Sequence, residues 1–396
     1  MKYVILVGDG LGDYPIPELG GLTPLAAART PHLDRLARRG LLGRVRTIPP
    51  GLAPGSDVAN LALMGYDPSL HRTGRAVFEA ASLKISLGPD EVAFRCNLVT
   101  LKNNENGRPV MADYSSGHLT TEQAQPLVES LKEELGSVRF TFHLGNSYRH
   151  ILVWSGGRSD FRLTPPHDLS GQLVTPQLDR LRAESPDLYY LTLASWSVLR
   201  DHPAAAGLKS PPTSIWLWGQ GRPPRLATFP ERFGLNGVVI SAVDLIKGLG
   251  IFVGLEPINV LGATGWLDTN YEGKVAAGLE ALSRLDFLYL HIEAPDEAGH
   301  TGILAYKLQA IEDFDARVVG PLLEGLERLG PFRLLVACDH NTPLSVMTHT
   351  AEPVPVLLFD SRFDLGHSPA FCEAEAAKGP DLDPASSLIE HLLERA

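Results

Sequence analysis

The sequence predicts an α/β protein built on a doubly wound, mostly parallel sheet, with a smaller α+β domain inserted into it. Three observations support this fold class. Apolar runs that fit strands alternate with longer helical patterns in the last third of the chain, as expected when helices join parallel strands. The first run, Tyr3–Val7, is apolar on both faces, which is typical of a strand covered by helices. The stretch 91–229 differs, because its strands are shorter and more polar and it is rich in Pro and Gly.

The other elements follow ordinary start and stop signals. After the strand at 3–7, Pro31 is expected to begin a helix that ends at Gly40, since Pro is favoured at the first helical position and Gly after the last. The segment 52–68 is a Pro/Gly turn that leads into a short helix. The last third is then predicted to contain a helix at 272–285, a strand at 286–292, a long helix at 303–329, strands at 332–337 and 354–359, and a helix at 386–395.

The length of the chain favours two domains. A chain of 396 residues is too long for one compact core. We expect residues 1–90 and 230–396 to form one discontinuous main domain and residues 91–229 to form the insert. The turn-rich segments PPHDLSGQ, KSPPTS and GQGRPPR all lie in the insert, which separates its composition from that of the main domain.

The composition excludes several classes of protein. A formal charge of −11 disfavours nucleic acid as a partner, because binding it needs a basic face. No apolar run reaches the roughly 18 residues that span a bilayer, and the opening MKYVILVGDG is too short for a signal peptide, so we expect a cytoplasmic protein with no membrane partner. The cysteines are widely spaced and form no CxxC pair, so we expect buried thiols rather than disulfides or a zinc ribbon: Cys96, Cys338 and Cys372.

Acidic and histidine residues directly follow three of the predicted strands. Because the carboxyl ends of parallel strands meet at one edge of a sheet, we expect these side chains to gather there. Carboxylate oxygen and imidazole nitrogen are ligands of zinc, manganese and related ions, and their number is enough for two divalent-metal sites. The residues are Asp9 after the first strand, Asp296 and His300 after the second, Asp339 and His340 after the third, and His349 nine residues beyond.

Ser56 is the candidate nucleophile. It lies in the segment Pro-Gly-Ser-Asp at the predicted start of a helix, and a helix N-terminus suits a phosphate group. A serine hydroxyl is a poor nucleophile unless a base or a cation lowers its pKa. Two divalent ions about 4 Å apart can do this and can stabilise the attacking and leaving oxygens of a displacement. The sequence therefore predicts metal-dependent phosphoryl transfer.

Several motifs carry a resemblance to known families. PGSDVANLALMGYDP, APDEAGHTG, DHNTP and MTHT resemble the alkaline phosphatase superfamily and, more closely, the archaeal type of 2,3-bisphosphoglycerate-independent phosphoglycerate mutase. The resemblance extends over almost the whole chain through TGRAVFEAA, FRCNLVT, WLWGQGRPP and AVDLIKGLG. It implies a phosphatase-like catalytic domain that holds both metals and an insert that helps to bind substrate. One metal would be held by Asp9, Ser56, Asp339 and His340, and the other by Asp296, His300 and His349.

The resemblance also implies a reaction. It is the interconversion of 3-phosphoglycerate and 2-phosphoglycerate through a phosphoserine at Ser56, without a bisphosphoglycerate primer. Manganese is the first choice of metal, with magnesium, zinc or cobalt as alternatives, and the oligomeric state is left open. Cations must hold the substrate carboxylate and phosphate, for which Arg is well suited. The candidates are Arg95, Arg149 and Arg222 of the insert and Lys247 and Lys274 of the main domain, with His118, His167 and Asp168 as further contacts or proton carriers.

Alternative readings remain open from sequence. The same site suits a phosphomonoesterase, or a phosphotransferase acting on another small acceptor in the manner of homoserine-kinase-like proteins. A kinase would need a nucleotide site, and no GxxxxGK[ST] loop is present. A more remote alternative is a non-catalytic binding protein on this fold. The histidines outside the motifs are expected to be ordinary core or surface residues: His291, His32, His71, His143, His202, His367 and His391.

Overall fold

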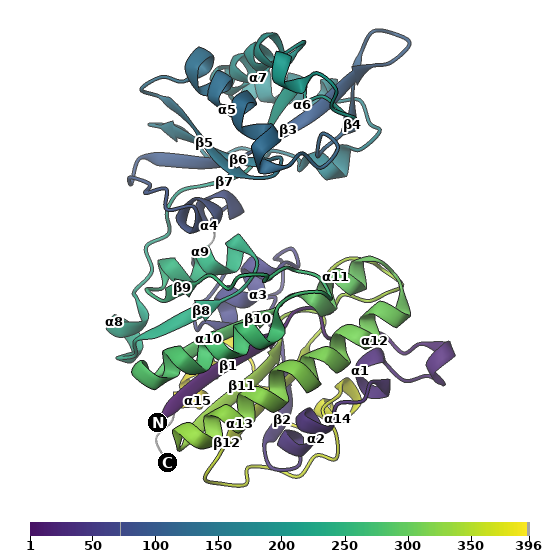
Figure 1. Cartoon of the computed structure of the whole chain (residues 1–396), viewed down its shortest axis with the longest axis vertical. Helices are drawn as coiled ribbons and strands as arrows, with labels where there is room; N and C mark the ends of the chain where they lie inside the picture. The colour runs from purple at the N-terminus through teal and green to yellow at the C-terminus, as the bar shows by residue number, and fades with distance from the viewer. Residues whose placement is uncertain (72, 394–396) are drawn as a thin grey trace. The chain divides into compact units, whose positions relative to one another are not determined.

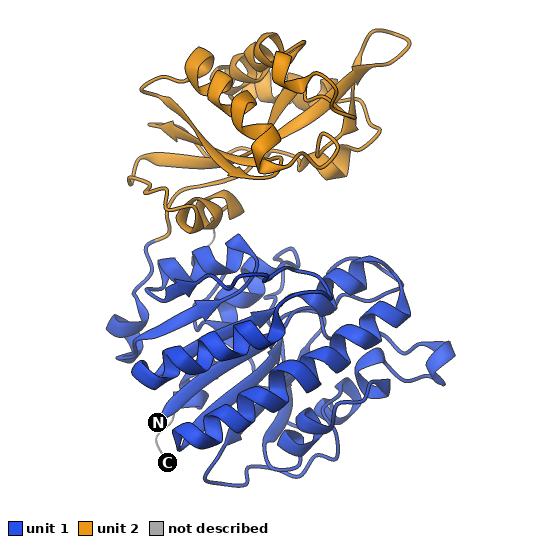
Figure 2. Cartoon of the chain, viewed as in Figure 1, with its two compact units in different colours: residues 1–72, 225–396 blue, residues 73–224 orange. Residues whose placement is uncertain are grey.

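The computed structural model describes residues 1–71 and 73–393. The chain divides into two compact units, which Figure 2 colours separately. Unit 1 comprises Met1–Arg72 and Arg225–Ala396, and unit 2 comprises Thr73–Pro224. Unit 2 includes helix α4 (Arg75–Ser82), which packs against the strands β3 and β7, so this compact unit begins before residue 91, where the sequence places the start of the insert.

Unit 1 contains the mostly parallel sheet that the sequence predicts. Its seven strands, counted over the described residues, have the order β2-β12-β11-β1-β10-β8-β9. The strands from β11 to β9 are parallel neighbours, whereas β12 runs antiparallel to both β11 and β2. The strand bounds are β1 Lys2–Gly8, β2 Leu41–Val45, β8 Gly237–Ile240, β9 Glu256–Ile258, β10 Phe287–Ile292, β11 Phe332–Cys338 and β12 Val354–Asp360.

Helices cover this sheet, and Figure 1 shows α10, α12 and α13 in front of it. The long helix expected at 303–329 is present, with a π-helical segment, Phe314–Val319, in its middle. The end of the last predicted helix, 394–395, lies outside the described residues. The helices of unit 1 are α1 Pro24–Ala27, α2 Pro31–Ala37, α3 Ser56–Leu63, α8 Phe229–Phe233, α9 Asp244–Phe252, α10 Tyr271–Arg284, α11 Ala294–His300, α12 Leu304–Asp313, α13 Gly320–Leu329, α14 Glu373–Ala376 and α15 Leu388–Leu393.

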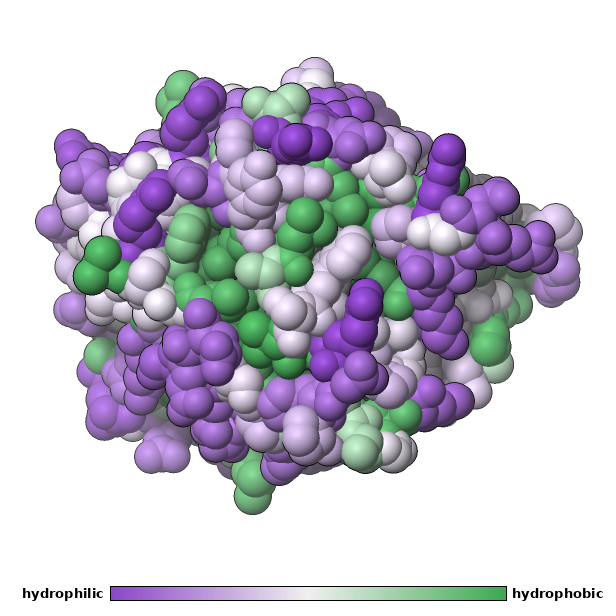
Figure 3. All heavy atoms as spheres, turned by 90° about the horizontal axis from the view of Figure 1, so that it is seen from above, coloured by the Kyte–Doolittle hydropathy of each residue, from purple (hydrophilic) through white to green (hydrophobic). Residues whose placement is uncertain are grey.

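The core of unit 1 follows from its strands. Every residue of β10 and β11 is buried, so both faces of these strands are covered, as their mostly apolar sequences predict. All three cysteines are free and buried, as expected. No helix in the described part of the chain is long and apolar enough to cross a membrane. On the face drawn in Figure 3, hydrophilic side chains surround a smaller hydrophobic area.

Unit 2 is an α+β unit with an antiparallel sheet, which confirms the expected class of the insert. The strands have the order β4-β3-β6-β5, and β7 pairs with β3. Helices α5 and α7 share one apolar core with the face of β3 that carries Phe94, Cys96 and Leu98. The bounds are β3 Glu91–Asn103, β4 Pro109–Asp113, β5 Phe140–Asn146, β6 Arg149–Ser155, β7 Ser214–Gly221, α5 Thr121–Leu135, α6 Thr175–Glu184 and α7 Pro186–Leu199.

Candidate metal centre

The carboxyl ends of three neighbouring strands bring the predicted ligands together. Strand β1 lies between β10 and β11 in parallel register, so the residues that follow these strands share one edge. The turn after β1 requires glycine at Gly10. Its φ is +60°, and an added Cβ would lie 2.6 Å from Thr342 Oγ1 and 2.8 Å from the Cα of Asp296. The Gly-Asp-Gly sequence at 8–10 thus lets two ligand-bearing segments approach each other.

One group of ligands, which we call the rim cluster, consists of Asp296, His300 and His349. The first two lie one helical turn apart on α11, as predicted. The Nε2 atoms of the two histidines are 3.1 Å apart, and Nε2 of His300 lies 3.2 Å from Asp296 Oδ2. Nε2 of His349 lies 3.4 Å from Asp296 Oδ1. Three ligand atoms therefore converge on one point at the edge of unit 1.

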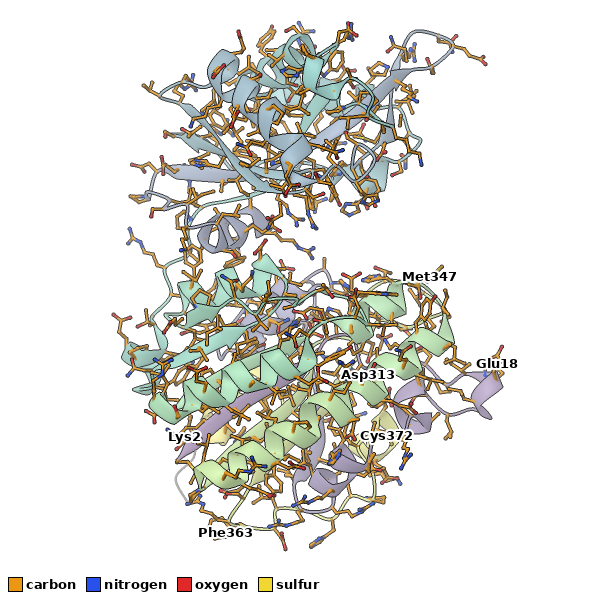
Figure 4. All side chains as sticks on the ribbon, viewed as in Figure 1. Lys2, Glu18, Asp313, Met347, Phe363 and Cys372 are labelled. Atoms are coloured by element: carbon orange, nitrogen blue, oxygen red, sulfur yellow. The ribbon has the colours of Figure 1, made fainter. Side chains whose placement is uncertain are left out.

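The protonation of the rim cluster suits a cation. The carbonyl of Met347, which Figure 4 labels, accepts a hydrogen bond of 3.0 Å from His300 Nδ1. A carbonyl can only accept, so Nδ1 carries a proton, and Nε2 is the nitrogen left to bind a cation beside Asp296 and His349. In the bare cluster Nε2 is protonated as well, because the hydrogen bond that Asp296 accepts from it raises the pKa of His300 to about 9. A bound divalent ion would take the place of that extra proton.

The second group, the buried cluster, consists of Asp9, Asp339 and His340, with Ser56 beside it. Nε2 of His340 lies 3.4 Å from Asp9 Oδ1 and 3.4 Å from Asp339 Oδ2. The hydroxyl of Ser56 is 3.1 Å from the same nitrogen. Asp9 Oδ1 is buried and has no hydrogen-bond partner. Burial, followed by the nearby Asp339 and Asp296, raises the pKa of Asp9 well above its usual range.

Both clusters fit a divalent ion. Their donors are oxygen and imidazole nitrogen, and the ligand atoms of each cluster lie within 4.8 Å of one another. Ligands about 2.0–2.2 Å from one ion are separated by distances of this order. An ion in the buried cluster would also satisfy the unpaired oxygen of Asp9 and offset the repulsion between two buried carboxylates. The described residues thus contain two groups of side chains that could each hold a metal ion.

Helix α3 delivers Ser56 to the buried cluster. Asn60, one turn further on, donates from Nδ2 to the carbonyl of Ser56 and to Asp339 Oδ2, at 2.9 Å each. The hydroxyl of Tyr289 on β10 donates to Asn60 Oδ1 at 2.6 Å. These bonds fix the first turn of α3 against the ligands. Sequence reasoning missed Asn60 and Tyr289, although an amide side chain among the apolar residues of α3 is a signal that could have found the first.

Thr342 connects the two clusters, and sequence reasoning missed this too. Its hydroxyl donates to Asp296 Oδ1 and lies 3.3 Å from His340 Nδ1. Because the hydroxyl proton is used on Asp296, the oxygen accepts from Nδ1–H of His340. His340 Nε2 is then left as a lone pair facing Ser56 and the carboxylates. The rings of His340 and His349 also stack, with centroids 4.0 Å apart.

Unit 2 gathers several of the predicted substrate residues on one face of its sheet. Five rings, which we call the ring cluster, lie edge to face at centroid distances of 5.4–6.4 Å. Arg95 stacks over Trp218 at 4.2 Å and forms an ion pair with Glu79, while Arg149 lies over Tyr148 at 5.3 Å. Asp168 is exposed beside His167, with 3.6 Å between their charged atoms. The ring cluster consists of Tyr114, His118, Tyr148, His167 and Trp218.

Two predicted substrate cations, Arg222 and Lys247, lie elsewhere. Arg222 donates to the carbonyls of Pro89 at 3.1 Å and Gly157 at 2.5 Å. Lys247 pairs with Asp244 at 2.9 Å on α9. These contacts stabilise loops and a helix. None of them bears on substrate binding, so the predicted substrate roles of both residues stay predictions.

Lys274 and His291 have surroundings that differ from the expected ones. Lys274 is fully buried and pairs with Glu293, an arrangement that does not suit contact with a substrate arriving from solvent. Burial raises the pKa of Glu293, but Lys274 and His291 outweigh this effect and lower it. His291 is buried, as expected of a core histidine. However, its Nε2 has no hydrogen-bond partner and lies 3.5 Å from Asp9 Oδ2.

The fold and the two clusters define a class of α/β enzymes in which a serine lies among the ligands of neighbouring metal sites. Comparisons with known proteins identify the family within this class. A sequence profile described as 2,3-bisphosphoglycerate-independent phosphoglycerate mutase matches residues 37–205. The chain is 50% identical to a probable enzyme of that name from Geobacter sulfurreducens, over 100% of both chains. It is 46% identical to the enzyme from Methanosarcina barkeri, again over 100% of both.

Solved structures agree with this assignment. A protein from Pyrococcus horikoshii matches with a TM-score of 0.81 and 29% identity, over 99% of this chain and 96% of that one. Cofactor-independent phosphoglycerate mutase from Thermoplasma acidophilum matches with a TM-score of 0.67 and 25% identity, over 99% of each chain. The chain belongs to the 2,3-bisphosphoglycerate-independent phosphoglycerate mutase family, which confirms the resemblance found in its motifs.

Proposed function

We propose that this chain interconverts 3-phosphoglycerate and 2-phosphoglycerate through a phosphoserine at Ser56. The observation that carries the proposal is the position of the Ser56 hydroxyl, 3.1 Å from His340 Nε2 and beside the buried carboxylates of Asp9 and Asp339. Family membership supports the same reaction, because the relatives are named for it.

The chemistry follows from the two clusters. Divalent ions held there would lower the pKa of a nearby hydroxyl and offset the charge of the phosphoryl group during transfer. The bond from Ser56 Oγ to phosphorus forms as the bond from phosphorus to O3 of glycerate breaks, and the serine proton passes to O3. The hydroxyl at C2 then attacks phosphorus and the bond from phosphorus to Oγ breaks. The proton of the C2 hydroxyl returns to Ser56. No primer and no net water are consumed.

The ligand set suits more than one metal, so the identity of the metal is part of the proposal. We propose Asp9, Ser56, Asp339 and His340 for one ion and Asp296, His300 and His349 for the other. Oxygen and imidazole donors suit manganese, which we propose first, and they also suit magnesium, zinc or cobalt.

We further propose unit 2 as the substrate-binding domain. The ring cluster and the two arginines that lie over its rings supply histidine and arginine side chains that suit a small anion. Arg95, Arg149, His118, His167 and Asp168 therefore stay candidates on unit 2. The roles of Arg222 and Lys247 and a cytoplasmic location remain predictions.

The test measures both fates of the phosphoryl group. Chelator-treated protein is given 3-phosphoglycerate with and without manganese, and 2-phosphoglycerate and free phosphate are followed together. Manganese-dependent 2-phosphoglycerate with little free phosphate supports the mutase. Free phosphate alone would make the chain a phosphomonoesterase, and the absence of both products with manganese, magnesium, zinc and cobalt would overturn the proposal.

A further inference from the structure

His291 lies in an unusual position at the end of β10, between three buried carboxylates. Its Nδ1 is 3.4 Å from Glu293 Oε1, and its Nε2 is 3.5 Å from Asp9 Oδ2 and 4.0 Å from Asp339 Oδ2. The side chain of His291 is 0% exposed and that of Glu293 is 1% exposed. A buried polar ring at this depth needs polar groups beside both nitrogens, and these carboxylates lie beside them.

Asp9 shows why His291 matters to the metal site. The two oxygens of its carboxylate face different imidazoles: Oδ1 lies 3.4 Å from His340 Nε2, and Oδ2 lies 3.5 Å from His291 Nε2. His340 is on the side of Ser56, where the ligand atoms of the buried cluster converge. At Asp9, His291 therefore faces the oxygen that His340 does not, whereas at Asp339 the same oxygen, Oδ2, is nearest to both histidines.

The ring of His291 is itself held in place. Glu293 Oε1 accepts hydrogen bonds from Ser241 Oγ at 2.7 Å and from the Ala242 amide at 2.6 Å, and its Oε2 pairs with Lys274. Lys274 also donates to the carbonyl of His291 at 3.3 Å. Groups from α10, from the end of β8 and from β10 thus fix one carboxylate, which faces Nδ1 of His291.

We propose that His291, held by Glu293 and Lys274, is a positioning residue that orients the carboxylate of Asp9 toward the metal of the buried cluster. The inference rests on the metal site of the proposed function. In metal sites, the groups that hold a ligand's second atom fix its direction, and their loss typically weakens metal binding about 10–100-fold. The proposal also gives Lys274 a role. The positive charge of Lys274 balances the charge of Glu293, so that Glu293 can be buried next to the imidazole ring of His291.

The test measures metal binding in the absence of substrate. Four variants of the full chain are compared after treatment with chelator: His291→Leu, His291→Gln, Glu293→Gln and, as a matched control, His150→Gln. His150 is also a buried histidine, but it lies on β6 of unit 2. Manganese affinity and stoichiometry are measured by calorimetry, and circular dichroism and thermal unfolding of the metal-free proteins report on the fold.

Each variant has a stated outcome. His291→Leu weakens one of the two manganese sites about 10–100-fold while two ions still bind at saturation. His291→Gln weakens it less than His291→Leu, because the amide can still donate to Asp9. Glu293→Gln weakens the same site severalfold, and His150→Gln leaves both sites unchanged.

Two results would overturn the proposal. Manganese affinity within twofold of the parent in folded His291→Leu would reduce His291 to a core residue. Loss of one bound ion at saturation in both His291 variants would make it a ligand. If His291→Leu does not fold, unchanged manganese affinity in both His291→Gln and Glu293→Gln would likewise reduce His291 to a core residue. Because no substrate is present, these outcomes do not depend on whether the chain is a mutase.

Discussion

The polar groups of unit 1 and unit 2 are organised in contrasting ways. In unit 1, Asp9, Asp339 and His340 are buried at the ends of neighbouring strands, and hydrogen bonds from the Gly10 amide and Asn60 hold Asp339 there. In unit 2, the ring cluster and its arginines are linked by edge-to-face rings and by cations over rings, and His118 and His167 are exposed. The first arrangement fixes charges before any ligand binds, whereas the second leaves side chains free to adjust to one.

The largest expected effect is at the buried cluster of unit 1. Asp339→Ala removes a carboxylate that accepts from the Gly10 amide at 3.0 Å and from Asn60. We expect loss of one bound ion and a fall in mutase activity of at least about a thousandfold, because metal stabilisation of the transferring group is worth several kcal/mol. Calorimetry with manganese and an assay of 2-phosphoglycerate check this. Two ions bound with near-parental activity would show that the buried cluster is not the metal site.

The second prediction concerns the stability of the metal-free protein. The pKa of Asp9 is raised in the fold, so the folded protein favours the neutral carboxyl. The stability of the folded protein at this site is therefore fully present below the unfolded pKa near 4 and is lost as pH rises. Asp9→Asn removes this cost. In chelator, the variant should gain on the parent by up to about 1.4 kcal/mol per pH unit above pH 4, until the folded Asp9 itself ionises.

Urea unfolding of both proteins at several pH values measures this difference. Manganese should reverse its sign, since only the parent has the intact ligand set. An Asp9→Asn advantage that does not depend on pH would contradict the assigned cause.

The third prediction concerns unit 2, where His150 behaves in the opposite way. Burial lowers the pKa of His150 to about 3, and the Gly145 amide donates to its Nδ1. The unfolded chain therefore binds a proton below about pH 6.5 that the folded chain refuses, and stability is lost as pH falls from 6.5 toward 3. At pH 5.5 the cost is about 1.4 kcal/mol.

His150→Phe should remove that part of the acid sensitivity. The measurement is the change in unfolding free energy between pH 7.5 and 5.5 in parent and variant. Equal changes in the two proteins would mean that His150 is protonated in the fold.

The smallest expected effect is at the arginines that lie over the ring cluster of unit 2. Arg149→Ala removes a guanidinium that lies over Tyr148 and has no ion pair among the described residues. We expect KM for 3-phosphoglycerate to rise about fivefold to tenfold with kcat and manganese affinity little changed, since a substrate contact that is lost equally in ground and transition states affects KM alone. An unchanged KM would separate the ring cluster from substrate binding.

The same contrast explains which residues the sequence could identify. An Asp or His just after a parallel strand must lie at one edge of the sheet, so the gathering of the ligands there followed from strand order, whereas their division into two sets came from the family resemblance. The helix at 303–329 followed from its apolar period. The antiparallel direction of β12 and the start of unit 2 at Thr73 depend on tertiary packing, which local patterns do not contain.

Residues whose role depends on a partner were harder to predict. A lysine in a helix looks like a surface cation, and only its burial against Glu293 shows that Lys274 belongs to the interior. Thr342 and Asn60 are small polar residues in motifs, and their function comes from the two groups that each one joins. His291 reads as a core histidine until Asp9 and Glu293 are placed beside it.

The central claim is that Ser56 accepts the phosphoryl group, and the most direct test is to find it there. Manganese-loaded protein is mixed with 3-phosphoglycerate, quenched in acid during turnover, digested and examined by mass spectrometry, with Ser56→Ala treated in parallel. We predict a phosphoryl group on Ser56 in the parent, and in the variant no label and no 2-phosphoglycerate, although the rim cluster still binds its ion. Formation of 2-phosphoglycerate by Ser56→Ala at the parental rate, or a label on another residue, would contradict the account.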